Sequence, residues 1–253
     1  RFESKARENG VVVHWAADAH SLCEIVEALL RARGVRRVVK SKSMLTEECG
    51  LNPWLEARGF DVVDTDLGER IVQLEGEPPS HIIVPAIHRT RAEVGALFHR
   101  HLGSPAGEDE PDQLMEHARA DLRSRFLAAE AGITGANFAV AESGSLVIVT
   151  NEGNADLGTS LPPLHITCLG IEKLVPDLDD VAVFLRLLAR SATGQALSVY
   201  TSFLAAPRAG GELHVVLVDN GRSALLASAT HRRALRCVRC GACLNTCPAY
   251  SRA

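Results

Sequence analysis

Residues 35–43, Val-Arg-Arg-Val-Val-Lys-Ser-Lys-Ser, read as a short apolar strand that leads directly into a helix. That helix is predicted to begin near Ser43 or Thr46 and to end near Gly59. The segment before Val35 repeats apolar residues at helical spacing and ends at Gly34, a residue typical of helix C-termini. A helix, a strand and a second helix follow one another here, which is typical of a sheet built from strand–helix units.

The same alternation continues on both sides of this stretch. Further apolar runs at 11–14, 60–63 and 81–84 read as strands, and helices are predicted at 89–102 and 113–131, the second one closed by Gly132. Short apolar strands alternating with helices indicate an α/β fold with a mostly parallel, doubly wound sheet that is covered on both faces.

The pattern changes after Gly132. Two apolar runs, 138–141 and 146–149, flank the turn-like tetrad Glu142-Ser-Gly-Ser145 and predict a β-hairpin. Further strands are predicted at 164–169, 199–204 and 213–218, with a helix at 179–190. A last helix, 222–234, leads to a cysteine-rich end, so we divide the chain into an α/β domain, 1–221, and the start of a second module, 222–253.

Composition limits the classes of function. The 253 residues carry a net charge of −4 and only 4% aromatic residues, which argues against nucleic acid as a partner. No apolar run approaches the roughly 20 residues of a membrane span. Seven cysteines, four of them clustered, suit a reducing cytoplasm better than a disulfide framework.

The cysteine-rich end reads Cys237-Val-Arg-Cys-Gly-Ala-Cys-Leu-Asn-Thr-Cys-Pro248. This Cys-x2-Cys-x2-Cys-x3-Cys-Pro spacing is typical of bacterial ferredoxins and predicts a [4Fe–4S] cluster. A structural zinc site and plain reduced cysteines are the alternatives, although zinc ligands usually come as two pairs separated by a dozen or more residues. In two-cluster ferredoxins the fourth cysteine ligates the other cluster, so Cys237, Cys240 and Cys243 are assigned to one cluster and Cys247 to a second.

The ligands of that second cluster are not in this sequence. The chain begins at Arg1 and stops at Ala253, before a second motif. We therefore expect a piece of a longer protein that carries two clusters, with cluster binding incomplete or absent in this piece.

A basic run precedes and enters the cysteine motif, at Arg232, Arg233, Arg236 and Arg239. Its positive charge could offset a negative cluster or dock an acidic electron partner. A solvated face is the third interpretation.

Polar residues that follow the predicted strands are the candidate ligand-binding residues, because ligands of open α/β sheets bind beyond the carboxyl ends of strands. Lys40 and Lys42 flank a helix start and predict an anion site, with solvated surface lysines as the alternative. His88 follows the run 81–84 and could be a ligand or a proton donor, or simply a histidine satisfied beside a helix start. Asp64 and Asp66 are more readily explained as caps.

The amides Asn137, Asn151 and Asn154 bracket the predicted hairpin and favour a pocket that hydrogen-bonds a small ligand. Their alternative role is to make turns. The three remaining cysteines are not persuasive nucleophiles: Cys23 and Cys168 lie in apolar segments, and Cys49 follows two glutamates that would raise the pKa of its thiol.

Several long stretches resemble the LUD (lactate-utilisation) domain family: 40–48 (KSKSMLTEE), 64–73 (DTDLGERIVQ), 78–88 (PPSHIIVPAIH) and 132–142 (GITGANFAVAE). The cysteine run resembles the ferredoxin-type module of the same proteins. Together they resemble the iron–sulfur subunits, LutB type, of bacterial L-lactate oxidation complexes.

The resemblance implies a fold like that of NagB, RpiA and the CoA transferases. It also implies electron transfer during oxidation of L-lactate to pyruvate, inside a three-subunit complex whose other subunits are the partners. The α/β domain would then bind a small carboxylate or dock those subunits. Two other functions stay open: group transfer of the CoA-transferase type, with Glu142 of a Glu-x-Gly turn as nucleophile, and a non-catalytic scaffold that presents the cluster module.

Overall fold

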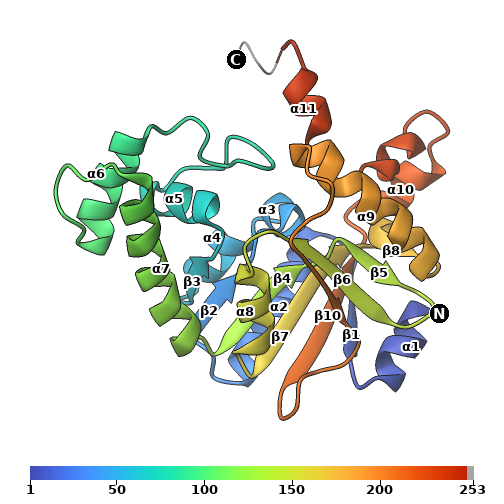
Figure 1. Cartoon of the computed structure of the whole chain (residues 1–253). Coiled ribbons are helices and arrows are strands. Elements are labelled where there is room, and N and C mark those ends of the chain that lie inside the picture. Colours follow the sequence, from blue (N-terminus) through green and yellow to red (C-terminus); the bar gives the residue numbers. More distant parts are fainter. Residues whose placement is uncertain (250–253) are drawn as a thin grey trace.

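A computed structural model of the chain describes residues 1–249 and shows an α/β fold around a six-stranded sheet (Figure 1). Its strands are β1 (Val12–Ala16), β2 (Arg37–Lys40), β3 (Asp61–Asp64), β4 (Ala131–Gly135), β7 (Leu164–Gly170) and β10 (Glu212–Val218). Every neighbouring pair is parallel, and the order across the sheet is β1-β10-β7-β4-β2-β3. The predicted α/β fold with a mostly parallel, doubly wound sheet is confirmed.

The central strands of this sheet are apolar on both faces because their alternate residues enter different cores. In β10, Leu213, Val215 and Leu217 are buried in one hydrophobic cluster, while Val216 and Val218 are buried in another. Strands covered on both faces need apolar residues at consecutive positions, which is why they appear as continuous apolar runs.

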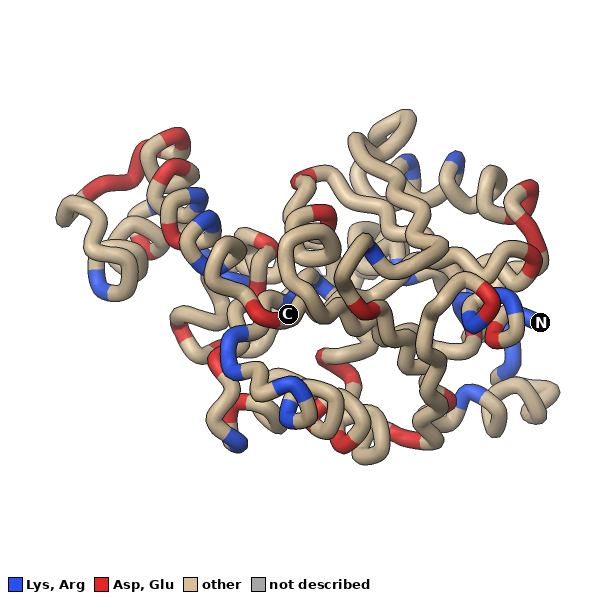
Figure 2. Tube along the Cα trace, turned by 90° about the horizontal axis from the view of Figure 1, so that it is seen from below, with Lys and Arg blue, Asp and Glu red and all other residues tan. Residues whose placement is uncertain are grey.

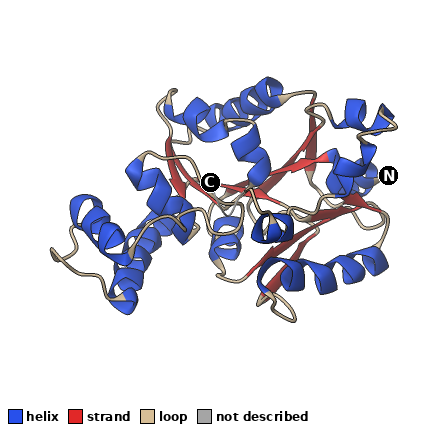
Figure 3. Cartoon of the chain, turned by 90° about the horizontal axis from the view of Figure 1, so that it is seen from above, coloured by secondary structure: helices blue, strands red, loops and turns tan. Residues whose placement is uncertain are grey.

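Helices cover the two faces (Figure 3). One face packs against α2 (Ala19–Ala32), α3 (Met44–Glu48) and α4 (Leu51–Glu56), which share the first cluster. The other face carries α1 (Phe2–Glu8), α7 (Pro111–Ala128) and α8 (Asn154–Ser160). Asp18 fixes the start of α2, since its carboxylate accepts the Ser21 N–H at 2.8 Å in a capping box.

A second, four-stranded sheet lies on the same side as α1, in the order β8-β5-β6-β9. Its strands are β5 (Phe138–Val140), β6 (Ser145–Thr150), β8 (Leu174–Val175) and β9 (Tyr200–Leu204). The predicted hairpin is confirmed, because β5 and β6 pair antiparallel. Helix α9 (Leu178–Thr193) packs against this sheet through Val181 and Phe184.

The remaining helices lie at the periphery. They are α5 (Leu67–Glu75), α6 (Arg91–Leu102), α10 (Arg222–Ala227), α11 (Ala242–Thr246) and the 3-10 segments η1 (Ile171–Lys173) and η2 (Arg232–Arg236). Among the described residues, no helix combines the length and apolar character needed to cross a membrane. Basic and acidic residues are interspersed along the trace (Figure 2).

The apolar run 81–84 is not a strand, contrary to the prediction. It lies in a loop between α5 and α6, made of turns and bends. The Nδ1 atom of His81 accepts the N–H groups of Ile83 and Val84, at 2.9 and 3.1 Å. These local bonds turn the chain back on itself, because a side chain that captures nearby N–H groups offers the backbone an alternative to sheet pairing.

Two helix ends also differ from the prediction. Gly132 does not close a helix: α7 ends at Ala128, and Gly132 lies inside β4, where a Cβ would come within 2.0 Å of the Gly158 carbonyl oxygen. The glycine is needed there for close approach of strand and helix. The helix predicted at 222–234 stops at Ala227, and the chain resumes as a 3-10 segment at Arg232. The predicted second module, 222–253, extends beyond the described residues at its last four positions.

Candidate functional site

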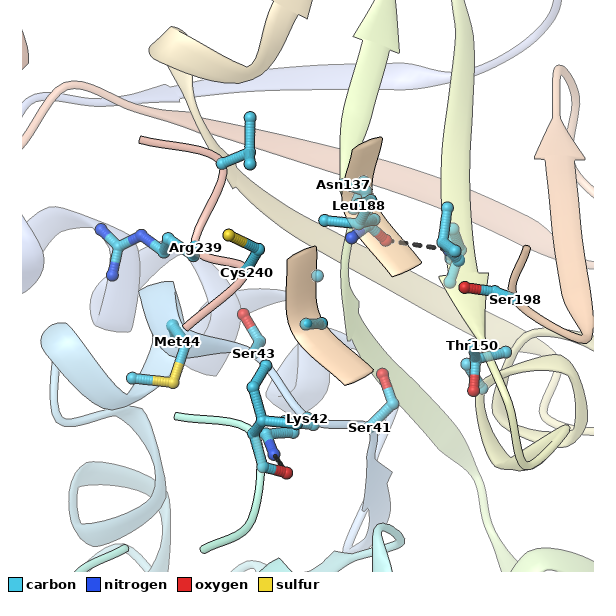
Figure 4. A pocket seen from close by; sticks show the side chains of 18 of the residues that line it. Ser41, Lys42, Ser43, Met44, Asn137, Thr150, Leu188, Ser198, Arg239 and Cys240 are labelled. Carbon is cyan, nitrogen blue, oxygen red and sulfur yellow. Dashed lines mark hydrogen bonds between the residues drawn. The ribbon is translucent and has the colours of Figure 1, made fainter. Parts of the chain in front are cut away.

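A cavity of about 460 Å³ opens at the carboxyl ends of β2, β4 and β7 (Figure 4). The chain leaves β2 toward the edge strand β3, and it leaves β4 in the opposite direction, toward β7. The two strands are neighbours, so the topological switch point of the sheet lies between them. The cavity is therefore at the place where open α/β sheets bind their ligands, and its volume is in the usual range of ligand sites, about 300–1,000 Å³.

Lys42 is the predicted cation that lines this cavity. It follows β2 directly, next to Ser43, whose hydroxyl oxygen caps α3 by accepting the Thr46 N–H at 3.4 Å. The ammonium donates one hydrogen bond, to the carbonyl oxygen of Ile83 at 2.8 Å. An ammonium group has three N–H donors, so Lys42 keeps donors for a ligand.

Lys40, only two residues earlier, does not line the cavity. Its side chain is completely buried, and its Nζ lies 2.8 Å from Asp64 Oδ1 and 3.2 Å from Glu47 Oε1. The Glu69 carboxylate is 3.9 Å away. Neither of the two sequence interpretations, an anion-binding or a solvated lysine, describes it: Lys40 is the cation of a buried ionic cluster, Lys40, Asp64, Glu47 and Glu69.

The ionic cluster shifts the pKa of its members. Burial alone would lower the pKa of Lys40, but the attraction of Asp64, Glu69 and Glu47 outweighs burial and raises it. Burial raises the pKa of Glu69 to about 8, partly opposed by Lys40. Glu69 is therefore largely protonated at neutral pH, which leaves Asp64 as the main buried partner of the lysine.

The three predicted amides all line the cavity, and each also makes hydrogen bonds within the protein. The Asn137 Oδ1 accepts the Val149 N–H at 2.8 Å, which fixes it to β6. The Asn151 side chain donates to Gln195 Oε1 and accepts the Val199 N–H, both at 3.0 Å. Thr150 donates to Asn154 Oδ1 at 3.4 Å. The amides shape the wall, and a ligand would meet their remaining N–H groups.

The structure places His88 and Glu142 away from the cavity. His88 lies on the loop before α6, where its imidazole pairs with Glu77 at 3.0 Å and with the Ser80 hydroxyl at 2.9 Å. Glu142 is exposed on the hairpin turn, and its N–H donates to the Pro176 carbonyl oxygen at 3.0 Å. The first is a satisfied histidine beside a helix start, and the second is a turn residue.

Sequence reasoning missed four charged residues of the cavity wall as ligand-binding candidates: Glu152, Glu172, Lys173 and Arg239. Desolvation by the cavity walls, together with Asp66, raises the pKa of Glu152. Burial lowers the pKa of Lys173, which follows β7. The strand-end rule could have found Glu172 and Lys173, which follow β7. Glu152 was hidden in a stretch read as a turn, and Arg239 in a basic run assigned to the cluster, to an acidic partner or to solvent.

The cysteine segment, residues 237–247, reaches this cavity. Val238, Arg239 and Cys240 line it, whereas Cys237 and Cys243 are exposed and Cys247 is half-buried. Within residues 1–249, no three His, Cys, Asp or Glu side chains converge in an arrangement that could hold a metal ion. The donor chemistry nevertheless fits an iron–sulfur cluster, since four thiols lie in one segment of eleven residues.

The other cysteines are buried, in agreement with the sequence analysis. Burial raises the pKa of both the Cys23 and the Cys49 thiol to about 11, and Glu48 adds to the effect at Cys49. Burial raises the pKa of Cys168 as well. These thiols stay protonated at neutral pH and are unreactive.

Comparison with known proteins identifies the family. The LUD domain family model matches residues 1–223. The chain is 46% identical to the "Uncharacterized electron transport protein YkgF" of Escherichia coli K12 and 47% identical to "Lactate utilization protein B" of Geobacillus thermodenitrificans. Each match covers 99% of this chain, but the chain spans only 54% of each relative.

Among solved structures, the chain is similar to a DUF162 family protein from Deinococcus radiodurans, with 15% identity and a TM-score of 0.47. That similarity covers 86% of this chain and 93% of the other. The family match covers most of the sequence and the two relatives cover nearly all of it. This chain belongs to the LUD domain family.

Proposed function

We propose that this chain is part of an iron–sulfur electron-transfer subunit that acts in the oxidation of L-lactate to pyruvate. The observation that carries the proposal is the run of four thiols from Cys237 to Cys247, in a chain closely similar to a lactate utilization protein B and to an electron transport protein. A bound [4Fe–4S] cluster would supply one-electron transfer. By the spacing rule, Cys237, Cys240 and Cys243 would hold one cluster and Cys247 would serve a second.

In this proposal the cavity binds a small carboxylate. The Lys42 ammonium has unused donors, and the amides of the wall offer hydrogen bonds to hydroxyl or carbonyl groups. The other subunits of a lactate oxidation complex would be the partners, in a reducing compartment such as the cytoplasm, where thiols persist.

The two alternative functions have less support. Group transfer through Glu142 needs a carboxylate nucleophile beside the bound substrate, and Glu142 is exposed outside the cavity. A scaffold that only presents the cysteine segment would not need a polar, lysine-containing cavity at the switch point. Ligand binding separates the scaffold from the carboxylate-binding subunit.

The first test is anaerobic incubation of a longer form of the protein, spanning the full length of its relatives, with ferrous iron and sulfide, followed by removal of unbound metal. We expect this longer protein to retain iron and acid-labile sulfide together, and its variant with Cys237, Cys240 and Cys243 replaced by serine to retain much less. Cys168→Ser is the matched control, because it removes a buried thiol outside the motif. Equal retention by the longer wild type, its triple variant and its Cys168→Ser variant, or none by any of the three, would contradict the iron–sulfur assignment.

The second test is calorimetric titration with L-lactate and with pyruvate. We expect heat of binding with at least one acid, lost in Lys42→Gln because that change removes the cation of the cavity. Lys5→Gln, an exposed lysine paired with Glu8, is the control and should bind like the wild type. Absence of heat with either acid would favour the scaffold function.

A further inference from the structure

The cysteine segment is fastened against the cavity by contacts on both sides of Cys240. The Lys173 ammonium donates to the carbonyl oxygen of Cys237 at 3.4 Å, and Val238 packs against the hydrophobic cluster below α9. Gly241 lies so close to Ile83 that a Cβ at that position would come within 2.9 Å of its side chain. The segment is therefore held where it borders the cavity.

Arg239 provides the strongest of these contacts. Its guanidinium donates to Glu48 Oε2 at 2.8 Å. The same carboxylate accepts hydrogen bonds from Arg222 at 3.0 Å and from Asn220 at 2.7 Å. Burial opposes ionisation of Glu48, but these donors outweigh it and lower its pKa to about 2. Charge-assisted hydrogen bonds to a shared carboxylate hold the segment in one orientation.

Arg222 anchors this arrangement in the α/β domain. Its side chain is buried, and it also pairs with Glu172, which follows β7. The two arginines and two glutamates balance in charge, so Arg239 is not available as a cation for a ligand. The cavity keeps Lys42 and Lys173 as its cations beside the carboxyl groups of Asp66 and Glu152.

Cys240 differs from the other three thiols of the motif in its position relative to the cavity. Of these four cysteines, all within the described part of the chain, Cys240 is the one that lines the cavity. In the view of Figure 4, Arg239 and Cys240 lie on the same side as Met44 and Ser43, with Thr150 and Ser198 on the opposite side. Lys42 lies at the base of that view, so the wall of one cavity carries both an available ammonium and a motif thiol.

We propose that the cavity and the cysteine segment form one composite site, in which an organic acid held by Lys42 lies against Cys240. The inference rests on the proposed function for the role of the motif, and it adds where the ligand lies relative to that motif. In this arrangement the bound acid contacts a residue of the cysteine segment directly.

The wall indicates the class of ligand. Lys42 suits a carboxylate, and the amides and hydroxyls suit hydroxyl or carbonyl oxygens. Apolar side chains complete the wall at Ile82, Ile83, Leu188 and Val238. We therefore expect a small organic acid with a polar group beside its carboxylate and a short apolar part, a description that L-lactate and pyruvate both meet.

The test measures the alkylation rate of each cysteine by peptide mass spectrometry, on metal-free protein under argon, with iodoacetamide as reagent. Sodium L-lactate and sodium pyruvate are the probes, and sodium chloride at equal ionic strength controls for screening. At an acid concentration of about ten times Kd, we expect Cys240 to react about tenfold more slowly, since only about one-tenth of the sites remain empty. Cys243, three residues away and exposed, should keep its rate.

Two variants complete the design. Lys42→Gln should abolish the protection of Cys240 by either acid, and Lys5→Gln should leave it intact. No protection of Cys240 by either acid, or equal slowing of Cys240 and Cys243, overturns the composite site. The readout needs no iron, so failure of cluster assembly would count against the proposed function alone. Calorimetric binding without protection of Cys240 would count against the composite site alone.

Discussion

The six-stranded sheet and the cysteine segment are fixed in different ways. The sheet is held by continuous parallel pairing and by two hydrophobic clusters that bury both of its faces. The cysteine segment has one short helix, α11, two exposed thiols and a few anchoring contacts at Lys173, Val238, Arg239 and Gly241. The sheet thus specifies its own shape, whereas the segment takes its position from the domain beneath it.

This difference also appears in the electrostatics. Beneath the sheet ends, Lys40 and its carboxylates are shielded from water, so a lost partner leaves a buried charge. At the segment, the Arg239–Glu48 pair is about one-third exposed, so water can replace a lost partner. Substitutions in the first region should therefore cost global stability, and those in the second should change local order.

Replacement of Lys40 should have the largest effect. Lys40→Met leaves the Asp64 carboxylate buried without a cation, and breaking a buried pair from one side costs about 3–5 kcal/mol. Lys42→Met, two residues away in the cavity wall, should change the unfolding free energy by less than about 1 kcal/mol. Urea unfolding of both variants checks this, and equal losses would show that the ionic cluster does not support the sheet.

Glu69 should make stability depend on pH. Its pKa is raised in the folded state to about 8, so the fold favours its protonated form. The stabilisation is fully present below the unfolded pKa, near 4.3, and is lost as pH rises through about 8. Lys40 stays charged throughout this window, because its pKa is raised.

Glu69→Gln mimics the protonated carboxyl and should remove this dependence. Relative to the variant, the wild type should lose on the order of a few kcal/mol of unfolding free energy between pH 4.5 and pH 8. Unfolding curves at several pH values give the difference, with the exposed Glu24→Gln as control. Parallel pH profiles for the wild type and Glu69→Gln would refute a protonated Glu69.

Substitution of Gly132 tests the packing of β4 against α8 and changes no charge. Gly132→Ala places a Cβ against the Gly158 carbonyl oxygen and should cost about 1–3 kcal/mol through overpacking. Gly158→Ala, in α8 on the other side of this contact, is the control, because a Cβ at that position meets no atom within 4 Å. It should be neutral or stabilising by up to about 1 kcal/mol, because alanine favours helix. Similar thermal midpoints for the two variants would disprove the close approach.

Arg239 should give the smallest change in stability and a clear change in local order. Arg239→Ala removes a partly exposed ion pair, worth about 1 kcal/mol or less. Hydrogen exchange at residues 238–241 should nevertheless accelerate, because the segment loses its tie to Glu48. The exposed Arg232→Ala is the control. Unchanged exchange in Arg239→Ala would show that other contacts suffice to hold the segment.

The sequence predicted the sheet because its strands contain short apolar runs. The stretches 11–14, 35–39 and 60–63 each hold two or three consecutive apolar residues, and this pattern can be recognised without knowing which strands pair. The run 81–84 has the same pattern but folds as a loop, because His81 accepts hydrogen bonds from the N–H groups of Ile83 and Val84. Such local side-chain hydrogen bonds produce no periodicity in the sequence, so the pattern did not reveal them.

The cavity was predictable in place but not in detail. The strand-end rule located Lys42, and the predicted hairpin located the amides, yet Lys40 met the same strand-end rule and proved to be buried. Strand register and the distant carboxylate of Glu69 separate the two lysines, and neither is visible in a local pattern. The Arg239–Glu48 contact joins residues 191 positions apart, so spacing could not reveal it.

The topology of the sheet also has a consequence for folding. Among the described residues, strand β1 lies at the edge of the sheet and pairs with β10 alone, so Val12 meets His214, about 200 residues further along the chain. During synthesis β1 must therefore wait for β10 before it has a partner. Such distant pairings slow folding and leave intermediates exposed. A chain that ended before residue 212 would lack the strand that pairs with β1. We therefore expect the α/β domain to fold as a single unit despite its two sheets.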